Sequence, residues 1–308
     1  MNWKVKALLQ RTISILPASE GINYLFQKHI SRNLPVNDKT LEEKIVLAAK
    51  RVEMYGRFST KPLEEGVFYE FGAGWDLIGP LATFALGVNK QILLDISPHV
   101  RFELINNALR RIAEKNKYFS SRSGKELRLF PVNQVNSVAE IDRNFGIEYK
   151  APADARATAL PEASVDHIST NSTLEHIPEE ALQQIMQESY RILRPGGIMH
   201  HYIDLKDQFT YFDSSLSKYN FLRYSPARWR VFNSSLQYQN RLRYPDYRRM
   251  IKQAGFEILL EELVHATDEE IRAFRKLPLH GAYRDLYSEQ ELTVQLYRIV
   301  ARKSKIIN

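Results

Sequence analysis

The residues best placed to bind a ligand form a short glycine turn next to two acids. Residues 68–76 read FYEFGAGWD, with Gly72 and Gly74 directly after an apolar run that predicts a strand. Glycines in such a turn let the backbone approach a ligand closely, and the helix expected from Asp76 leaves unpaired N–H groups at its start. Asp95 ends the next predicted strand, where its carboxylate can accept hydrogen bonds from the vicinal hydroxyls of a ribose. Turn and acid together predict a nucleotide-type site.

A second group of candidates contains the histidines and acids that could accept a proton. His176 follows one predicted strand, and the run HHYIDLKD, residues 200–207, ends another. Neighbouring residues on a strand point to opposite faces, so only one of His200 and His201 can face a cleft. We expect His201 to act as a general base that Asp204 orients, with His176 as a further candidate. The same cluster could hold a divalent cation, but no spacing in it is diagnostic, and we predict no metal site.

Both groups need elements that bring the ends of several strands to one edge of a sheet. From about residue 66, short apolar runs alternate with helical patterns, which predicts an α/β fold with a doubly wound, mostly parallel sheet of seven strands. The predicted strands span residues 67–71, 91–95, 147–150, 165–170, 198–203, 256–264 and 292–302. The predicted helices of this core span residues 76–87, 98–115, 179–193 and 246–254. Residues 116–146 show little periodicity and are expected to form a long connection.

The remaining segments extend or interrupt this core. Residues 3–16 and 40–57 predict helices, the first of them amphipathic because apolar residues recur at helical spacing: Val5, Leu8, Leu9, Ile13 and Leu16. We expect a helical N-terminal extension over residues 1–60, the core over 61–204, an insert over 205–244 and the last part of the core sheet over 245–308.

The insert is rich in aromatic and basic residues. Aromatic rings and guanidinium groups suit sugar rings, phosphates, carboxylates or stacked bases, so the insert could be a lid over an acceptor. The alternative is that the aromatic residues build the core of a small helical subdomain and the arginines are solvated. The residues concerned are Phe209, Tyr211, Phe212, Tyr219, Phe221, Tyr224, Trp229, Phe232, Tyr238 and Tyr244, with Arg223, Arg228, Arg230, Arg241 and Arg243 between them.

Composition and charge exclude several classes of function. The chain has 308 residues and no cysteine, which excludes disulfide scaffolds, cysteine-ligated zinc and cysteine nucleophiles. The formal net charge of +7 favours an anionic partner without choosing among phosphates, acidic glycans, nucleic acid and lipid. No apolar run is long enough to cross a membrane as a helix. We expect a cytoplasmic protein whose basic N-terminal helix permits peripheral contact with the inner face of a membrane.

The turn at residues 70–74 resembles the acidic-x-Gly-x-Gly motif of the class I S-adenosylmethionine-dependent methyltransferases. A dinucleotide-binding fingerprint would place a third glycine where this chain has Leu77. Three later blocks resemble the same family, in its methyltransferase type 11 form and in matching order: PADARATALPEASVDHI from Pro152, STNSTLEHIPEE from Ser169 and YRILRPGGIMHH from Tyr190. The resemblance covers about residues 64–204, and the final strands extend it to about residue 302.

This resemblance implies a Rossmann-like fold, S-adenosylmethionine as the cofactor, and a role for each matched position. The positions at the methionine end of the cofactor would be Glu70, Gly72, Gly74 and Asn171, the ribose would be held by Asp95, and the adenine would lie beside Ile96, Asp154 and Ala155.

The expected reaction is methyl transfer to a hydroxyl of a saccharide, nucleotide-sugar or lipid-linked glycan, as in polysaccharide biosynthesis. Methylation through a cysteine adduct is excluded, and the Asn-Pro-Pro-aromatic signature of amino-group methylation in nucleic acid is absent, since the place reads Asn171-Ser172-Thr173-Leu174. RNA or another small molecule stays possible as the acceptor, although a charge of +7 is small for a nucleic-acid partner. Two further functional classes stay open, an NAD-dependent oxidoreductase and a non-catalytic cofactor-binding protein. The sequence does not predict the oligomeric state.

Overall fold

A single mixed sheet organises the chain. The computed structural model describes residues 2–16, 19–25, 27–28 and 33–304. Seven strands lie in the order β3-β2-β1-β4-β5-β7-β6. β1 to β5 are parallel, and β7 runs antiparallel to both β5 and β6. The strands are β1 (Val67–Phe71), β2 (Lys90–Leu94), β3 (Ile147–Lys150), β4 (Val165–Asn171), β5 (Leu193–Asp204), β6 (Phe256–His265) and β7 (Val294–Lys303). The predicted α/β class, strand number and mostly parallel arrangement are confirmed.

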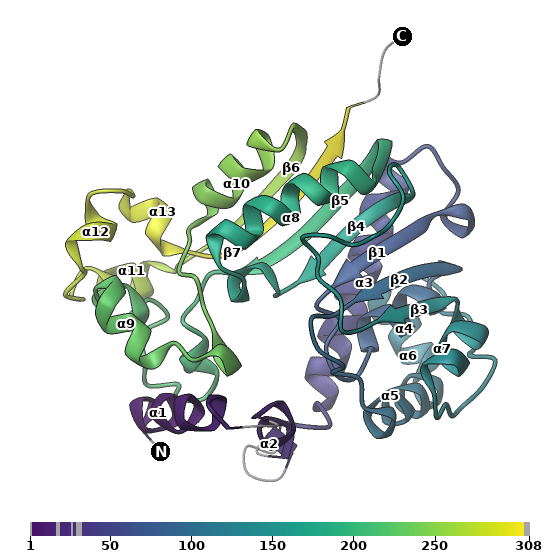
Figure 1. Ribbon diagram of the computed structural model, residues 1–308, viewed down its shortest axis with the longest axis horizontal. Helices are drawn as coiled ribbons and strands as arrows, with labels where there is room; N and C mark the ends of the chain where they lie inside the picture. Colours follow the sequence, from purple (N-terminus) through teal and green to yellow (C-terminus); the bar gives the residue numbers. More distant parts are fainter. Residues whose placement is uncertain (1, 17–18, 26, 29–32, 305–308) are drawn as a thin grey trace.

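Helices cover both faces of the sheet (Figure 1). α3 (Asp38–Phe58), α4 (Ile78–Ala85) and α5 (Phe102–Glu114) share a hydrophobic core with residues such as Phe68 of β1. α8 (Glu179–Ile192) and α10 (Tyr244–Gln253) share the core of the other face with Tyr69 and Phe71. Because neighbouring residues of β1 enter different cores, both faces of the strand are buried, as expected for a doubly wound sheet.

Two helices occupy the segment that shows little periodicity. α6 (Asn116–Ser123) and α7 (Val138–Phe145) lie between α5 and β3. The Ser137 hydroxyl caps α7 by accepting a hydrogen bond from the Glu140 N–H, and Gly146 ends the helix with a φ of +61°. This Ser-x-x-Glu and terminal glycine pattern is a helix signal that the periodicity alone did not reveal.

A second lobe lies beside the sheet and has its own aromatic core. It joins α1 (Trp3–Ser14), α9 (Pro226–Phe232), α11 (Asp268–Phe274), α12 (Gly281–Arg284) and α13 (Glu289–Thr293). Figure 1 shows α9 and α11 to α13 gathered on one side of the sheet, with α1 beneath them. α2 (Ser19–Leu25) follows α1. The aromatic core contains Trp3, Phe209, Tyr219, Phe221, Tyr224, Trp229, Phe274 and Tyr283.

Most aromatic residues of the insert therefore belong to a subdomain core, whereas Tyr211 lies outside it and is exposed. Arg241 and Arg243 are also buried, and each donates hydrogen bonds to backbone carbonyls. This core includes residues on both sides of the expected boundary between 244 and 245 and takes in the N-terminal helix. No helix in the described ranges is both long and apolar enough to span a bilayer.

Candidate functional site

The turn after β1 adopts the backbone conformation that its glycines allow. Gly72 and Gly74 have φ values of +75° and +76°, and the Gly72 N–H donates a 2.9 Å hydrogen bond to the Leu94 carbonyl. A Cβ atom on Gly72 would lie 2.5 Å from Cγ2 of Thr173. Leu77 takes the left-handed conformation as well, with a φ of 49°, although it is not glycine and is fully buried. The left-handed conformation costs roughly 1–2 kcal/mol for a residue other than glycine, so the surrounding packing must stabilise Leu77 in it.

Asp95 is a buried carboxylate directly after β2. The residue is 5% exposed, and the Tyr149 hydroxyl donates a 3.2 Å hydrogen bond to its Oδ2. Burial raises the pKa of Asp95 to about 7 and the charge of Glu70 adds to this, while Tyr149 and the Gly74 N–H oppose the shift. A carboxylate that is costly to ionise alone is stabilised by a ligand that donates hydrogen bonds to it.

A cavity of about 380 Å³ brings the turn and the acid together. Five of the positions expected to bind the cofactor line it: Gly72, Asp95, Ile96, Asp154 and Ala155. The Asp154 carboxylate forms an ion pair of 2.6 Å with Arg156, which holds the pKa of Asp154 below its usual range. Ile96 is 71% exposed, which leaves its side chain available as a platform for an apolar ring. The wall is apolar with one buried carboxylate, and it fits an adenosine group.

Glu70 and Gly74 do not line this cavity. Glu70 shares a face of β1 with Phe68, so its side chain points toward α3, where its Oε2 lies 2.5 Å from an Arg51 nitrogen. The place of Glu70 at the methionine end stays a prediction, and in this structure its carboxylate is paired with Arg51. Gly74 acts through its N–H, which hydrogen-bonds to Asp95.

His176 lies at the edge of the same cavity. Its Nδ1 is 2.7 Å from the carbonyl oxygen of Tyr238, a residue of the insert. Burial lowers the pKa of His176, so the ring is neutral near pH 7, and a neutral ring that donates from Nδ1 carries its lone pair on Nε2. The insert thereby fixes the orientation of a histidine in the cofactor cavity.

The expected pair of His201 and Asp204 does not form. His201 is fully buried on the α8 side of β5, and its Nδ1 lies 2.8 Å from the Thr170 hydroxyl. Burial lowers the pKa of His201 to about 3. Asp204, an odd number of residues further along the strand, points to the opposite face. His201 therefore reaches no cleft, and the base-and-orienter arrangement is wrong.

A second cleft of about 580 Å³ lies on the α3 side, at the end of β4 and β5. Its wall includes Asn171 and Ser172 at the end of β4, and Tyr202 and Asp204 of β5. The other charged side chains on it are Lys44, Lys50, Lys206, Arg122 and Arg298, with the acids Glu42 and Glu43. The Asn171 Oδ1 is buried and has no hydrogen-bond partner among the described residues. An unpaired buried amide oxygen is costly, so this side chain is suited to a ligand that donates to it.

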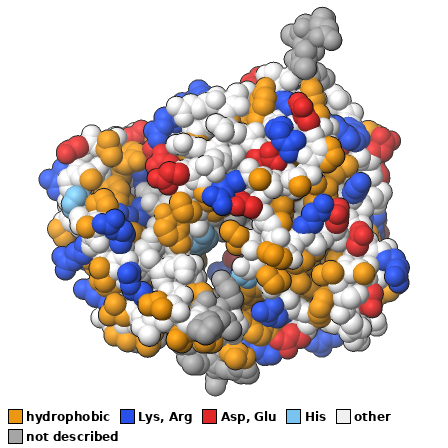
Figure 2. All heavy atoms as spheres, in the orientation of Figure 1, with side chains coloured by type: hydrophobic (Ala, Val, Ile, Leu, Met, Phe, Trp, Pro, Cys, Tyr) orange, Lys and Arg blue, Asp and Glu red, His pale blue; other side chains and the backbone are white. Residues whose placement is uncertain are grey.

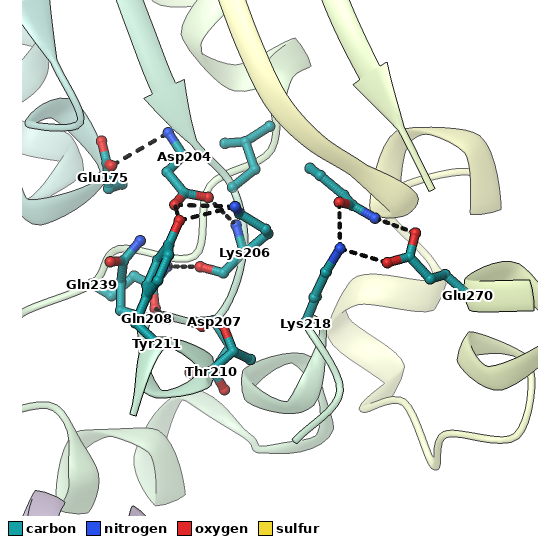
Figure 3. A network of polar contacts seen from close by, with 12 residues as sticks. Glu175, Asp204, Lys206, Asp207, Gln208, Thr210, Tyr211, Lys218, Gln239 and Glu270 are labelled. Carbon is teal, nitrogen blue, oxygen red and sulfur yellow. Dashed lines mark hydrogen bonds and ion pairs between the residues drawn. The ribbon is translucent and has the colours of Figure 1, made fainter. Parts of the chain in front are cut away.

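Asp204 is the centre of a polar network in this cleft (Figure 3). The Tyr211 hydroxyl donates a hydrogen bond of 2.5 Å to Asp204 Oδ2, and the Lys206 N–H donates one of 3.0 Å to Oδ1. The Lys206 ammonium donates to the Tyr211 oxygen over 2.9 Å. Beneath them, Glu175 accepts a hydrogen bond from the Asp204 N–H, and burial raises the pKa of Glu175 well above its usual range. Asp204 is thus a carboxylate held by donors on both of its oxygens, next to a buried acid whose pKa is raised.

One short turn separates the two cavities. Thr173 lines the first, whereas Asn171 and Ser172 line the second. Ser172 has a φ of 49°, an unusual value for a serine and one that reverses the chain between them. Figure 2 shows this face of the molecule hollowed near its centre, between the sheet and the second lobe. No cluster of three or more His, Asp or Glu that could hold a metal ion occurs in the ranges given above.

No sequence pattern indicated Arg51 and Tyr149, because their partners Glu70 and Asp95 lie in other elements of the chain. Lys206 lies within residues 200–207 and Tyr211 among the aromatic residues of the insert, but the sequence assigned neither of them a role at Asp204.

A family model described as a methyltransferase domain matches residues 121–200, from the end of α6 into β5. Over these residues the chain matches a methyltransferase domain, in agreement with the resemblance to S-adenosylmethionine-dependent methyltransferases that its motifs indicate. The chain is similar to a structure of SAM-dependent methyltransferases from Methanosarcina mazei, with 13% identity over 82% of this chain and 97% of the other, and a TM-score of 0.47. It is also similar to geranyl diphosphate C-methyltransferase from Streptomyces coelicolor, with 12% identity over 87% and 85% of the two chains and a TM-score of 0.45. No curated protein sequence matches it. Similarities this weak say nothing about the acceptor.

Proposed function

We propose that this methyltransferase methylates a hydroxyl of a saccharide-type acceptor, with the cofactor in the first cavity and the acceptor in the second cleft. The proposal rests on the turn at residues 171–173. Asn171 and Ser172 line the second cleft, and the next residue, Thr173, lines the first cavity. In-line transfer needs donor and acceptor to meet at a short distance, and alignment of this kind can contribute roughly 7–11 kcal/mol to lowering the barrier.

The first cavity suits the adenosine half of the cofactor. Asp95 can accept from the two ribose hydroxyls, and Ile96 and Ala155 offer apolar surface to the adenine. When bound, S-adenosylmethionine supplies an electrophilic methyl group on a sulfonium. The residues of this chain then need to hold the acceptor oxygen and remove its proton.

Asp204 is the proposed proton acceptor, in place of the buried His201. A carboxylate oxygen of Asp204 would accept the proton of the acceptor hydroxyl when that oxygen is methylated. The Lys206 N–H and the Tyr211 hydroxyl hold this carboxylate in one orientation. General base catalysis of this kind contributes roughly 100- to 10,000-fold.

The composition of the cleft favours a saccharide that carries an anionic group. Tyr202 and the 67% exposed Tyr211 offer ring faces to a sugar. Basic side chains outnumber the acids Glu42, Glu43 and Asp204 on the wall, and Lys50 forms no ion pair among the described residues. A nucleotide-sugar or a lipid-linked glycan combines a sugar with phosphate, so both fit the charge and the rings. A role in polysaccharide biosynthesis follows from that acceptor.

The test is methyl transfer from labelled S-adenosylmethionine to pools of glycans, nucleotide-sugars and RNA, read by the mass gain of one methyl group. We expect product in a saccharide pool. Asp204→Asn should lower transfer by about 100-fold or more with unchanged affinity for S-adenosylhomocysteine, whereas Asp95→Ala should weaken that affinity. Asp285→Asn, an exposed acid of the second lobe, is the matched control. Product found only in RNA, or full transfer by Asp204→Asn, would contradict the proposal.

A further inference from the structure

The first helix is docked on the protein with its more apolar side facing outward. The residues of α1 that are buried are Trp3, Lys6, Ala7 and Gln10, of which two are polar. Opposite them, Val5, Leu8 and Leu9 are 48%, 47% and 45% exposed. A helix that packs on a globular domain usually buries its apolar stripe, so this arrangement is inverted.

This orientation is fixed by specific packing. The Trp3 ring lies 5.1 Å from the ring of Phe209 and 5.0 Å from that of Phe232. The Lys6 ammonium lies 4.2 Å from the centre of the Phe212 ring. A rotation of the helix that buried Leu8 and Leu9 would remove all three contacts. The packing of Trp3 and Lys6 therefore keeps Leu8 and Leu9 on the exposed side of the helix.

The apolar surface continues beyond the helix and is surrounded by positive charge. Ile15 and Leu16 are 79% and 48% exposed, and Val231 of the neighbouring α9 is 45% exposed. The exposed basic residues on these two helices are Lys4, Arg11, Arg228 and Arg230. No acid occurs from residue 2 to residue 16 or in α9. Figure 2 shows blue and orange side chains with little red over the lower left of the molecule, where these helices lie.

We infer that this surface, formed by α1 and α9, docks on a membrane that contains anionic lipid. Leucine and valine side chains can enter the boundary between headgroups and acyl chains, while the lysine and arginine side chains meet the lipid phosphates. A protein partner for the same surface would need a strongly acidic rim, whereas an anionic bilayer supplies negative charge over the whole area. The surface adds a membrane-facing side to the enzyme without a spanning helix.

The docking surface lies next to the acceptor cleft in the chain and in space. Phe209 and Phe212, which hold α1, flank Tyr211, whose hydroxyl meets Asp204. Under the proposed function, membrane docking therefore brings the acceptor cleft close to the lipid surface, where a lipid-linked saccharide is presented. The docking itself does not depend on that function.

Vesicle flotation with the full chain tests this inference. We expect the protein to float with vesicles of equal parts phosphatidylglycerol and phosphatidylcholine, to float less as salt increases, and not to float with phosphatidylcholine alone. Leu8→Glu with Leu9→Glu should lower the partition coefficient by about tenfold or more, because two apolar contacts become two negative charges. Arg228→Glu with Arg230→Glu should lower the partition coefficient by a similar factor at low salt. At high salt the difference from the unmodified protein should become small, because salt screens the charges.

Matched variants separate this surface from general charge and hydrophobicity. Leu129→Glu with Leu286→Glu changes two leucines that are 75% and 72% exposed elsewhere and should float as the unmodified protein does. Arg110→Glu with Lys117→Glu is the corresponding control for charge. All variants should bind S-adenosylhomocysteine with unchanged affinity, so a failure of docking is distinct from a failure of the proposed function. No flotation of the unmodified protein, equal flotation of the Leu8/Leu9 variant, or a dimer in sedimentation that this variant abolishes without any lipid binding would overturn the inference.

Discussion

The hydroxyl of Tyr149, at the end of β3, donates a hydrogen bond of 3.2 Å to the carboxylate of Asp95, at the end of β2. The same hydroxyl accepts a hydrogen bond from the His99 N–H over 3.1 Å. Two neighbouring strands and the following loop are thereby joined at the carboxylate that faces the cofactor cavity. Because burial raises the pKa of Asp95 to about 7, this carboxylate is only partly ionised in the free enzyme at neutral pH.

Binding of S-adenosylhomocysteine should strengthen as the pH rises from 6 to 8. Ribose hydroxyls donate to the ionised carboxylate, so below a pKa of about 7 binding must first release a proton. We expect the affinity to increase by up to about tenfold per pH unit below the midpoint and to level off above it. Titration calorimetry across this range, in buffers of different ionisation enthalpy, measures both the affinity and the released proton.

Two variants test the assignment of this titration to Asp95. Asp95→Asn should bind weakly and without this pH dependence, and Tyr149→Phe should move the midpoint to higher pH because a stabilising donor is lost. Since the folded-state pKa lies above the unfolded value, the ionisation of Asp95 lowers the free energy of unfolding as the pH rises through about 4 to 7. Asp95→Asn should therefore raise the melting temperature of the free protein at pH 8. A lower melting temperature would contradict a raised pKa.

A side chain at Gly72 should disrupt the cofactor site, whereas one at Gly79 should not. Gly72→Ala places a Cβ atom 2.5 Å from Thr173 Cγ2 in a backbone with a φ of +75°, so we expect a loss of about 2–4 kcal/mol in the free energy of unfolding and weaker cofactor binding. Gly79 lies inside α4 and a Cβ there meets nothing within 4 Å, so Gly79→Ala should be neutral or stabilising. Denaturant unfolding and calorimetry measure both.

The clash at Gly72 can be separated from the strain. Thr173→Ala removes the two nearest atoms, Cγ2 and Oγ1, but leaves the backbone conformation unchanged. Gly72→Ala combined with Thr173→Ala should regain part of the lost stability. If the double variant is as unstable as Gly72→Ala alone, the contact with Thr173 is not the cause.

The parts of the fold that sequence predicted are those with a strong local pattern. All seven strands were predicted, six of them within two residues at each end, because short apolar runs bounded by turns mark where a strand lies. The start of β5 was placed five residues too late, at 198 instead of 193. A small helical subdomain was expected only as an alternative and only from the insert, whereas the core of the second lobe joins Trp3, Tyr224 and Tyr283 from three separate stretches of the chain. Contacts that close long loops leave no periodic signal in any one of these stretches.

The residues of the candidate site also differ in how well the sequence predicts them. Positions that work through the backbone or at strand ends, such as Gly72 and Asp95, were predictable from glycine spacing and from the end of an apolar run. Side-chain direction was not, because one residue of error in strand phase reverses the face, as happened for His201. The outward face of α1 could not be predicted either, since an amphipathic pattern shows which residues share a side and not which side is covered.

The ion pair of Arg51 and Glu70 should contribute to stability more than pairs on the surface do. The two side chains are 7% and 9% exposed, and their closest atoms are 2.5 Å apart. Glu70→Gln leaves the Arg51 charge buried without its partner, so we expect a loss of about 3–5 kcal/mol in the free energy of unfolding. Glu257→Gln, at the surface pair with Arg302, should cost less than about 1 kcal/mol. Arg51→Met combined with Glu70→Leu should recover much of the loss, and equal losses for the double and single variants would mean that the unpaired charge is not the cause.

Removing the Tyr211 hydroxyl should slow methyl transfer without affecting the cofactor. This hydroxyl and the Lys206 N–H hold Asp204 in one orientation, and hydrogen bonds to a charged group contribute roughly 1.5–3 kcal/mol. Since its ring is 67% exposed, Tyr211→Phe should leave the melting temperature almost unchanged. We expect kcat to fall by about tenfold or more, with unchanged affinity for S-adenosylhomocysteine, because Tyr211 does not line the cofactor cavity. Tyr190→Phe, on the ring that packs against Phe256, is the control and should keep full activity. A Tyr211→Phe enzyme with normal kcat would show that Asp204 is held sufficiently by Lys206, and one with weakened cofactor binding would place Tyr211 at the cofactor instead of the acceptor.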